Sequence, residues 1–346
     1  MATTEPKKPG PSPLSVRRKP VEASPEAWVR TRSLRPQGGV PFLVEPALDG
    51  VDLASWSAQN RQRIETWLRE HRALLFRGFR VSSVADFQAF ARATSDGEFL
   101  EYRDRSTPRE TLDTKVYSST VYPADQVINL HNEGTYWKAW PAKIFFCCLT
   151  APRTGGETPI ADVRRVHDHV DSEIRDAFAR KKVMYVRNYN DGFGLPWHEV
   201  FQTTDRAEVE TYCRANDIAF EWKGGDRLRT RQVRPAIRVH PRTGEKLWFN
   251  HGAFFHWSAL EPAAREFFAG KFDVADFPYN TYYGDGTPID PEVVAHLLDA
   301  YRQEKVVFGW EEGDILMMDN MSVAHAREAY TGERKIVVAM TESLTD

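Results

Sequence analysis

The sequence predicts a mainly β protein with inserted helices, built as a β-sandwich or jelly roll. From Val40 onward, short apolar segments follow one another: "VPFLVE", "ALLFRGF", "KVYSS", "QVINLH", "KIFFCCL", "RPAIRVH", "LWFN", "KVVFGW", "DILMMDN" and "RKIVVAM". Helical periodicity is confined to a few stretches between them, at 55–71, 82–94, 163–180, 204–216 and 291–304. Many short strands that do not alternate regularly with helices favour sheet packed on sheet over βαβ winding.

The chain divides into two segments of different composition. Residues 1–38 are rich in Pro, Lys and Arg and lack apolar periodicity, so we expect a flexible arm there. Residues 39–346 are expected to form one domain, in which no repeat is visible. A basic arm could contact nucleic acid or an acidic partner, but simple solvation is the favoured interpretation.

Overall composition argues against several classes of partner. Charged residues make up 27% of the chain and the net charge is −3, so neither nucleic acid nor another polyelectrolyte is implied. No apolar run approaches the roughly 20 residues that cross a bilayer, and the N-terminus lacks the apolar segment of a signal peptide. Three cysteines provide neither a disulfide framework nor a zinc spacing. We therefore expect a cytoplasmic protein whose metal, if any, has nitrogen and oxygen ligands.

His131 and Glu133 stand out at the end of the strand-like segment "QVINLH". Side chains two apart on a strand point to the same face, so an imidazole and a carboxylate would converge there. Such a pair supplies two of the three ligands of a facial iron site. The alternative is an ordinary surface His and Glu at a strand end. His325, after the buried strand "GDILMMDN", is the candidate third ligand, although a lone histidine is more often structural.

A second His-x-Asp pattern, His169-Val170-Asp171, is not expected to bind metal. It lies in the stretch 163–180, which reads as helix. Residues i and i+2 of a helix diverge by about 200°, so the two side chains cannot share one ion.

Six motifs in order resemble the taurine-dioxygenase-like (TauD/TfdA) branch of the Fe(II)- and 2-oxoglutarate-dependent oxygenases, and within it the SyrP-like and clavaminate-synthase-like subgroup. They are "NLHNEGTYW" with "PAKIFFCC", "GGETPIADVRRV", "WFN", "YYGDGTPI", "WEEGDILMMDNMSVAHAR" and "GERK". They run from about Val40 to Ser343, nearly the whole chain outside the arm. The resemblance implies a double-stranded β-helix, a cupin-like jelly roll, around one iron.

The same resemblance implies the metal ligands. The family's His-x-Asp/Glu pair corresponds to His131 and Glu133, and its distal histidine to His325. Glutamate departs from the commoner aspartate but is similar to clavaminate-synthase-like members. Since halogenating relatives lack this carboxylate, Glu133 argues against halogenation.

For the co-substrate, the resemblance implies Thr158 in "GGETP" and Arg334 in "GERK", with Arg327 in "HAR" as a second arginine. A planar guanidinium suits the distal carboxylate of 2-oxoglutarate. The division of this work between Arg327 and Arg334 stays open. The alternative for both is surface pairing with Glu328 or Glu333.

Substrate contacts are predicted at three residues that could equally belong to the core. Asn129 precedes His131 by two positions, Tyr136 follows the ligand pair, and Asn250 ends the "WFN" segment. The polar stretch 98–112 reads as a mobile entrance loop.

The activity implied is that of an oxygenase using Fe(II), 2-oxoglutarate and O2, with succinate and CO2 as co-products. We expect hydroxylation of an unactivated C–H in an amino-acid-derived or natural-product substrate of specialised metabolism, such as antibiotic biosynthesis. The small-molecule substrate could be free or tethered to a carrier protein, and a homo-oligomer is compatible with the sequence. Alternatives are desaturation or cyclisation by the same chemistry, a zinc hydrolase, and a non-catalytic binding protein.

Overall fold

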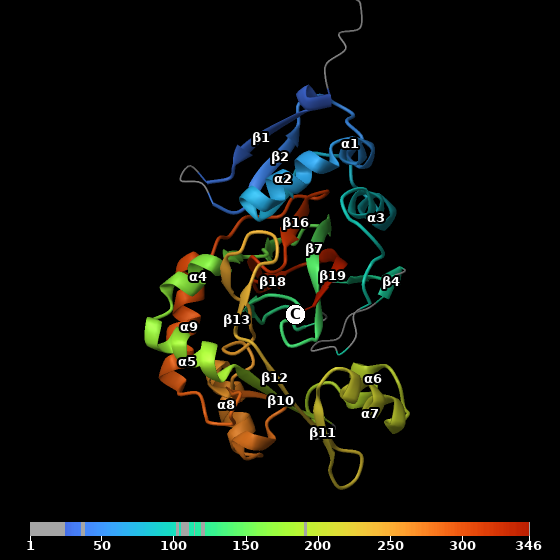
Figure 1. Cartoon of the computed structure of the whole chain (residues 1–346). Helices are drawn as coiled ribbons and strands as arrows, with labels where there is room; N and C mark the ends of the chain where they lie inside the picture. Colours follow the sequence, from blue (N-terminus) through green and yellow to red (C-terminus); the bar gives the residue numbers. More distant parts are fainter. Residues whose placement is uncertain are drawn as a thin grey trace, which may run out of the picture.

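A central eight-stranded sheet organises the protein (Figure 1). The computed structural model describes residues 25–35, 39–101, 104, 111–113, 115–118, 122–189 and 192–345. In spatial order the strands of this sheet are β1 (Val29–Ser33), β2 (Phe42–Pro46), β3 (Ala73–Phe76), β16 (Ile315–Asp319), β7 (Ala139–Thr150), β19 (Lys335–Thr345), β5 (Val116–Ser118) and β4 (Thr111–Asp113). Within it β2 and β3 pair in parallel, and the other neighbours are antiparallel.

Both faces of the central strands are buried. On β16, Ile315 and Met317 belong to one apolar cluster, while Leu316 and Met318 belong to another on the opposite face. Successive side chains of a strand alternate between faces, so a strand covered on both sides needs apolar residues at every position. This explains why "KIFFCCL" and "DILMMDN" read as continuous apolar runs.

Three helices cover one face of the sheet: α1 (Leu53–Gln59), α2 (Arg61–His71) and α3 (Val84–Ala93). Figure 1 shows them beside β2 and β16 at the top of the molecule. The sequence predicts one helix over 55–71, which is wrong. Asn60 leaves helical geometry (φ −115°, ψ 20°), ends α1 and begins α2, and its side-chain amide donates to the Trp56 carbonyl.

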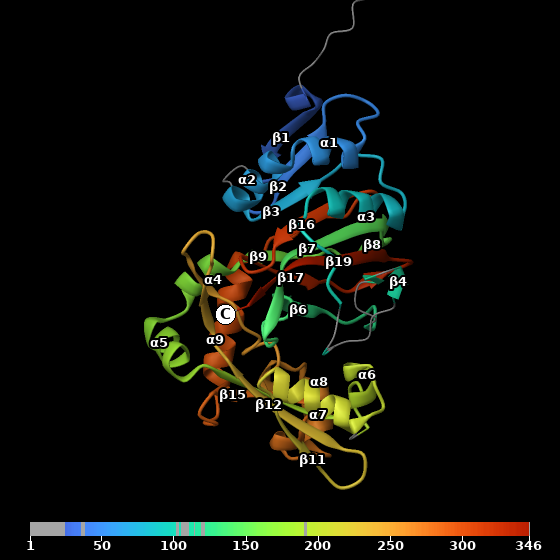
Figure 2. The same cartoon turned by 45° about the vertical axis from the view of Figure 1, so that its right-hand side comes forward.

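A three-stranded sheet covers the other face, in the order β6 (Ile128–His131), β17 (Val323–Arg327) and β9 (Ile160–Asp162). Its apolar residues Ile160 and Val323 join the cluster formed by the second face of β7, β16 and β19. Figure 2 shows β6, β9 and β17 against β7 and β19. A short ladder of β8 (Thr154–Gly155) with β18 (Tyr330–Thr331) closes one end.

The chain between β9 and β16 builds the remaining half of the molecule, at the left and bottom of Figure 1. Its four-stranded sheet has the order β11 (Ala219–Trp222), β12 (Leu228–Arg234), β10 (Val183–Tyr189) and β15 (Tyr279–Tyr283), and a separate hairpin pairs β13 (Ile237–Val239) with β14 (Lys246–Trp248). The helices are α4 (Val163–His169), α5 (Ser172–Lys181), α6 (Trp197–Phe201), α7 (Arg206–Ala215), α8 (Pro262–Ala269) and α9 (Pro291–Glu304). Short 3-10 turns lie at η1 (Pro25–Trp28), η2 (Trp257–Ala259) and η3 (Val274–Asp276).

Several predicted boundaries differ from the structure. The stretch 163–180 is two helices, and "KVVFGW" contributes one isolated bridge, from Val306 to Ile160, in place of a strand. β1 lies within the segment predicted as an arm and pairs with β2. The rest of that arm, 1–24 and 36–38, lies outside the described residues. Within the described part of the chain, no helix is both long and apolar enough to cross a membrane.

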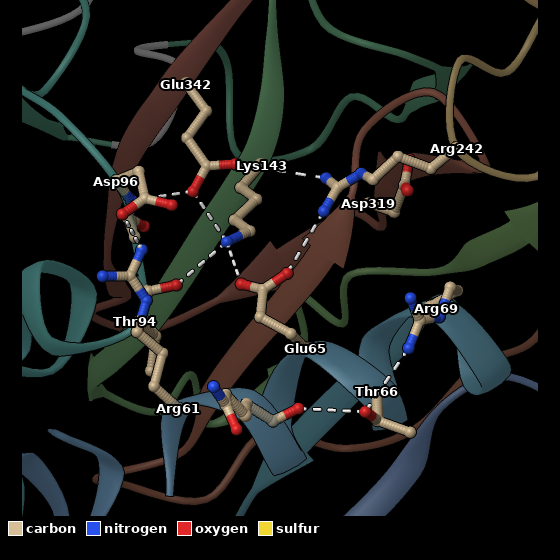
Figure 3. A network of polar contacts seen from close by, with 12 residues as sticks. Arg61, Glu65, Thr66, Arg69, Thr94, Asp96, Lys143, Arg242, Asp319 and Glu342 are labelled. Atoms are coloured by element: carbon tan, nitrogen blue, oxygen red, sulfur yellow. Dashed lines mark hydrogen bonds and ion pairs between the residues drawn. The ribbon is translucent and has the colours of Figure 1, made fainter. Parts of the chain in front are cut away.

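A buried lysine joins the sheet to its helical cover (Figure 3). Lys143 on β7 has a side chain only 1% exposed, and its ammonium contacts Glu65 of α2 and Glu342 of β19, the latter at 2.7 Å. Its third donor bonds the Thr94 carbonyl at 2.9 Å. The three donors of the ammonium are thus satisfied, which is the condition under which a buried charge is tolerated.

We expect Lys143→Met to lower the free energy of unfolding by about 3–5 kcal/mol, because two neighbouring carboxylates lose their shared counter-ion. Lys138→Met is the matched control: its side chain is 50% exposed and pairs with the exposed Asp217, so this variant should lose much less stability. Urea denaturation measures both. Equal losses in the two variants would contradict the buried network, whereas adding Glu65→Gln and Glu342→Gln to Lys143→Met should restore part of the stability.

Candidate metal centre

Three predicted ligands converge between the two sheets. One nitrogen each from His131 and His325 and one carboxylate oxygen of Glu133 lie within 4.8 Å of one another. His131 and His325 are cross-strand partners on β6 and β17, with ring centroids 4.5 Å apart. On the other side His325 packs against Phe146 of β7, at 4.9 Å between centroids. Two imidazoles and a carboxylate are a donor set that suits Fe(II) and leaves coordination positions for other ligands.

The strand ends earlier than the sequence suggests. β6 stops at His131, and Glu133 lies in the turn that follows. Gly134, at φ +71°, makes this turn possible, because a Cβ there would lie 2.4 Å from the Trp137 ring. Convergence of the two side chains therefore depends on a tight turn and not on strand alternation alone.

The orientation of His131 is set by a backbone oxygen. Its Nδ1 lies 2.8 Å from the carbonyl oxygen of Asn129. A carbonyl can only accept, so Nδ1 carries the hydrogen and Nε2 keeps its lone pair for a metal. Such an outer hydrogen bond fixes both tautomer and ring orientation.

Asn320 holds the turn that carries Glu133. Its side-chain oxygen accepts from the Glu133 N–H at 2.8 Å, and its amide donates to the Glu133 carbonyl at 2.9 Å and to the Pro141 carbonyl at 2.8 Å. Asn132 returns a bond to the Asn320 carbonyl at 2.7 Å. Sequence reasoning assigned Asn320 no role of its own, although its position directly after a buried strand was a usable signal.

Thr158 and Arg334 lie together next to β17, because the residues that follow Thr158 pair with that strand: Pro159 accepts from the Ala326 N–H and Ile160 is the cross-strand partner of His325. The guanidinium donates from Nε to the Gly156 carbonyl at 2.9 Å and approaches the Thr158 hydroxyl at 3.5 Å, which also accepts from Trp310 at 3.0 Å. Arg334 directly precedes β19. Gly156, at φ +70°, admits it, since a Cβ would lie 3.1 Å from the Arg334 side chain.

Among the described residues, the surroundings of Arg334 disfavour its positive charge. Burial, and next the positive charge of Arg327, lower the pKa of Arg334 to about 10. A bound carboxylate would reverse this unfavourable balance. The hydroxyl and guanidinium together therefore suit an anionic ligand.

The guanidinium of Arg327 binds backbone carbonyls. It is 5% exposed and donates to the carbonyls of Tyr122, Pro123 and Gln126 at 2.9, 2.5 and 2.8 Å. These bonds tie the segment that leads into β6 against β17. Of the two candidate arginines, Arg334 is the better placed to meet a ligand.

The predicted substrate contacts fall in different surroundings. Asn129 is exposed and Asn250 is buried, and both line a crevice of about 320 Å³ beside β6. The Asn250 amide donates to the Ala236 carbonyl at 2.9 Å and its oxygen accepts from the Gly252 N–H at 2.8 Å. Asn250 thus lines the crevice, but both ends of its side-chain amide are already hydrogen-bonded to the backbone, which limits the bonds it can make to a substrate.

Tyr136 lies in the core. It is 1% exposed, and its hydroxyl donates to the Asp104 carbonyl at 2.9 Å. Asp104 in turn pairs with the buried Arg187. This geometry favours a structural role for Tyr136 in anchoring the turn after Glu133. Most of the predicted entrance loop 98–112 lies outside the described residues.

His169 takes no part in the centre. Its Nε2 lies 2.7 Å from a Glu304 carboxylate oxygen, while Asp171 faces His296 at 3.9 Å. The two side chains of this His-x-Asp pattern have separate partners. The helical geometry predicted for the pattern is wrong, because Val170 is extended (φ −73°, ψ 132°) and separates α4 from α5.

A His-Glu-His centre held between two sheets, with a buried arginine and threonine beside it, defines a class of mononuclear metal oxygenase that binds an oxo acid. The chain belongs to the taurine catabolism dioxygenase TauD, TfdA family, which matches residues 31–340. Its enzymes are oxidoreductases that use Fe(II), 2-oxoglutarate and O2.

Individual relatives agree with this assignment. The chain is 40% identical over 279 residues to the dapdiamide synthesis protein DdaC of Enterobacter agglomerans, covering 81% of this chain and 84% of that protein. It is 27% identical over 318 residues to a clavaminate synthase-like protein of Arabidopsis thaliana, covering 88% and 91%. Among solved structures, PvcB of Pseudomonas aeruginosa shares the fold with a TM-score of 0.53 at 18% identity, covering 90% of each chain.

We expect His131→Ala or His325→Ala to abolish stoichiometric Fe(II) binding, because each removes one of the three donors that converge in the described part of the chain. His169→Ala is the control and should bind iron as the wild type does. Equilibrium dialysis with metal analysis measures the stoichiometry. Loss of iron in the His169 variant alone would overturn the ligand assignment.

We expect Arg334→Ala to raise the KM for 2-oxoglutarate by about 10- to 150-fold, the equivalent of one charge-assisted contact of about 1.5–3 kcal/mol. Arg334→Lys keeps the positive charge but loses the planar guanidinium. Its KM for 2-oxoglutarate should lie between those of the wild type and Arg334→Ala. Arg327→Ala should lower the thermal midpoint, since three backbone carbonyls lose their donor. If Arg327→Ala raised the KM for 2-oxoglutarate more than Arg334→Ala does, Arg327 would be the arginine that binds the co-substrate.

Proposed function

We propose that the protein hydroxylates an unactivated C–H of an amino-acid-derived or natural-product substrate in specialised metabolism, coupled to conversion of 2-oxoglutarate to succinate and CO2. The convergence of His131, Glu133 and His325 within 4.8 Å, beside Thr158 and Arg334, is the observation that carries the proposal. The fold proposed for it is a double-stranded β-helix, with the eight-stranded and three-stranded sheets as its two halves.

In this proposal His131, Glu133 and His325 hold Fe(II), which activates O2 when the oxo acid is bound. His131 coordinates through Nε2, because Nδ1 is committed to the Asn129 carbonyl. Glu133 supplies the one negative charge among the ligands, and Asn320 fixes its backbone from two sides.

Arg334 and Thr158 orient 2-oxoglutarate by its distal carboxylate, with Arg327 acting at longer range through its charge. Asn129 and Asn250 border the crevice through which we propose the substrate to reach the centre, and Tyr136 supports the covering turn. The protein's part in selectivity is to hold one C–H near the metal and to exclude water from it.

The relatives support specialised metabolism as the setting. DdaC is described as a dapdiamide synthesis protein, and PvcB as an oxygenase from an isonitrile synthetic pathway. Free amino acids, carrier-bound aminoacyl thioesters and natural-product intermediates all remain substrates within the proposal. A zinc hydrolase has no need of the Thr158–Arg334 clamp, and desaturation or cyclisation would require the same protein groups as hydroxylation.

The test is succinate formation from 2-oxoglutarate with a panel of amino acids and their carrier-bound thioesters, with products identified by mass. We expect Glu133→Gln to lose most activity, because size is kept but the charge that offsets Fe(II) is removed. Glu133→Asp should keep weak activity, since the turn after Gly134 can adjust by about one methylene. Wild-type turnover in Glu133→Ala, with iron content unchanged, would refute the three-ligand centre.

A further inference from the structure

His240 is a buried histidine on the loop that joins β13 to β14, and it is not part of the ligand set. It is 3% exposed, and its Nε2 lies 2.9 Å from Oδ2 of Asp319, the last residue of β16. Asn320, which holds the turn of Glu133, is the next residue along the chain. The imidazole is thus one residue removed from a contact that positions a metal ligand.

The backbone of this loop fixes the tautomer of His240. Nδ1 accepts from the Arg242 N–H at 3.2 Å and from the Thr243 N–H at 3.1 Å. A backbone N–H can only donate, so Nδ1 carries no hydrogen. The hydrogen of the ring is therefore on Nε2, and the imidazole donates it to the Asp319 carboxylate.

The two oxygens of Asp319 have different partners. Oδ1 accepts from the Met321 N–H at 3.0 Å and from the Ser322 N–H at 3.1 Å, which closes a tight turn over residues 319–322. Among the described residues, the His240 ring is the one hydrogen-bond partner of Oδ2. The Asp319 side chain is only 9% exposed, and a buried carboxylate oxygen without a donor is costly. The His240 donor therefore keeps Asp319 in the orientation that closes the turn.

The turn closed by Asp319 bears on two of the three proposed ligands. Asn320, its second residue, bonds both the N–H and the carbonyl of Glu133 through its side chain. The turn also leads directly into β17, whose third residue is His325. Hydrogen bonds behind a ligand fix its orientation. A displacement of the turn would therefore move Glu133 and His325 relative to His131.

The loop between β13 and β14 is itself anchored to the helical cover. The Arg242 guanidinium pairs with Glu65 of α2 at 3.2 Å (Figure 3). Glu245 pairs with Arg72, which ends α2, at 2.8 Å, and the Arg72 carbonyl accepts from the Asp319 N–H at 2.9 Å. The imidazole is thus presented to Asp319 by a loop that is held on more than one side.

We propose that His240 is a positioning residue for the metal centre. It acts through Asp319 on the turn that holds Glu133 and leads to His325. This assignment rests on the proposed three-ligand centre and adds to it a group that touches neither metal nor substrate. Removal of hydrogen-bond partners behind metal ligands typically lowers metal affinity by about 10- to 100-fold. Loss of the His240 donor should accordingly weaken iron binding under conditions in which the protein stays folded.

Two amide replacements separate the two sides of the ring. The amide of His240→Gln reaches the place of Nε2 and can still donate to Asp319, whereas the shorter His240→Asn reaches only the place of Nδ1 and keeps the loop bonds. We expect the dissociation constant for Fe(II), measured anaerobically by competition with a chromogenic chelator, to rise by about 10-fold or more in His240→Asn. His240→Gln should lie closer to the wild type. An unchanged dissociation constant in His240→Asn would refute the positioning role.

Arg77→Met is the matched control for a loss of stability alone. Arg77 pairs at 2.6 Å with the buried Asp314, which directly precedes β16, whereas Asp319 ends this strand. This variant should lower the thermal midpoint and leave the affinity for Fe(II) unchanged. If Arg77→Met weakened iron binding as much as His240→Asn does, the effect would be one of overall stability, and the positioning role would be wrong.

Hydrogen exchange in the metal-free protein follows the turn without iron. The Glu133 amide, which donates to Asn320, should exchange faster in His240→Asn than in the wild type, and as in the wild type in Arg77→Met. Unchanged exchange in His240→Asn would contradict the path through Asp319. Iron retained in His131→Ala would refute the three-ligand centre itself. Iron lost in His131→Ala but bound with wild-type affinity in His240→Asn would refute only the positioning role.

Discussion

The antiparallel pairing of β6 with β17 is the constraint on which the centre depends. It places His131 directly opposite His325, so two ligands far apart in the chain become neighbours through backbone hydrogen bonds alone. A slip of one residue would turn either imidazole to the other face. The register is secured in turn by Arg327, which binds the segment leading into β6 through three carbonyls. The buried guanidinium of Arg327 therefore stabilises the register of β6 with β17.

The charges of Glu133 and Arg334 cancel when both ligands are absent or both are present, but not when the metal is bound alone. Glu133 contributes one negative charge and Arg334 one positive charge, while Fe(II) brings two positive and 2-oxoglutarate two negative charges. The sum is zero for the complete assembly and positive when the oxo acid is missing. Burial first, and then the positive charge of the nearby Arg327, lower the pKa of Arg334, and a bound carboxylate would oppose both effects. Co-substrate binding should therefore stabilise this region.

The sequence predicted the residues of the centre better than the geometry that unites them. The pattern of His131 and Glu133 was readable, but β6 ends at His131, and the turn that aims Glu133 depends on Gly134 and Asn320. The Gly134 turn packs on the nearby Trp137, but Asn320 comes from a segment remote in sequence, and no local periodicity encodes that contact. The four-stranded sheet was missed because its strand β12, "LRTRQVR", carries three arginines and offers no apolar run. Asn60 likewise interrupts a helical period that looked continuous.

The residues that line the proposed substrate crevice were the hardest to predict from the sequence, and the structure gives the reason. The crevice is lined from β6, the turn after β14, α9 and the end of β17, four segments with no common period. Its most suggestive polar residue, Asn250, is occupied by the backbone, and Tyr136 is bound to Asp104. When polar side chains near a site are already satisfied, discrimination falls to shape and to the few donors that are left. On this surface the exposed side-chain amide of Asn129 is such a donor.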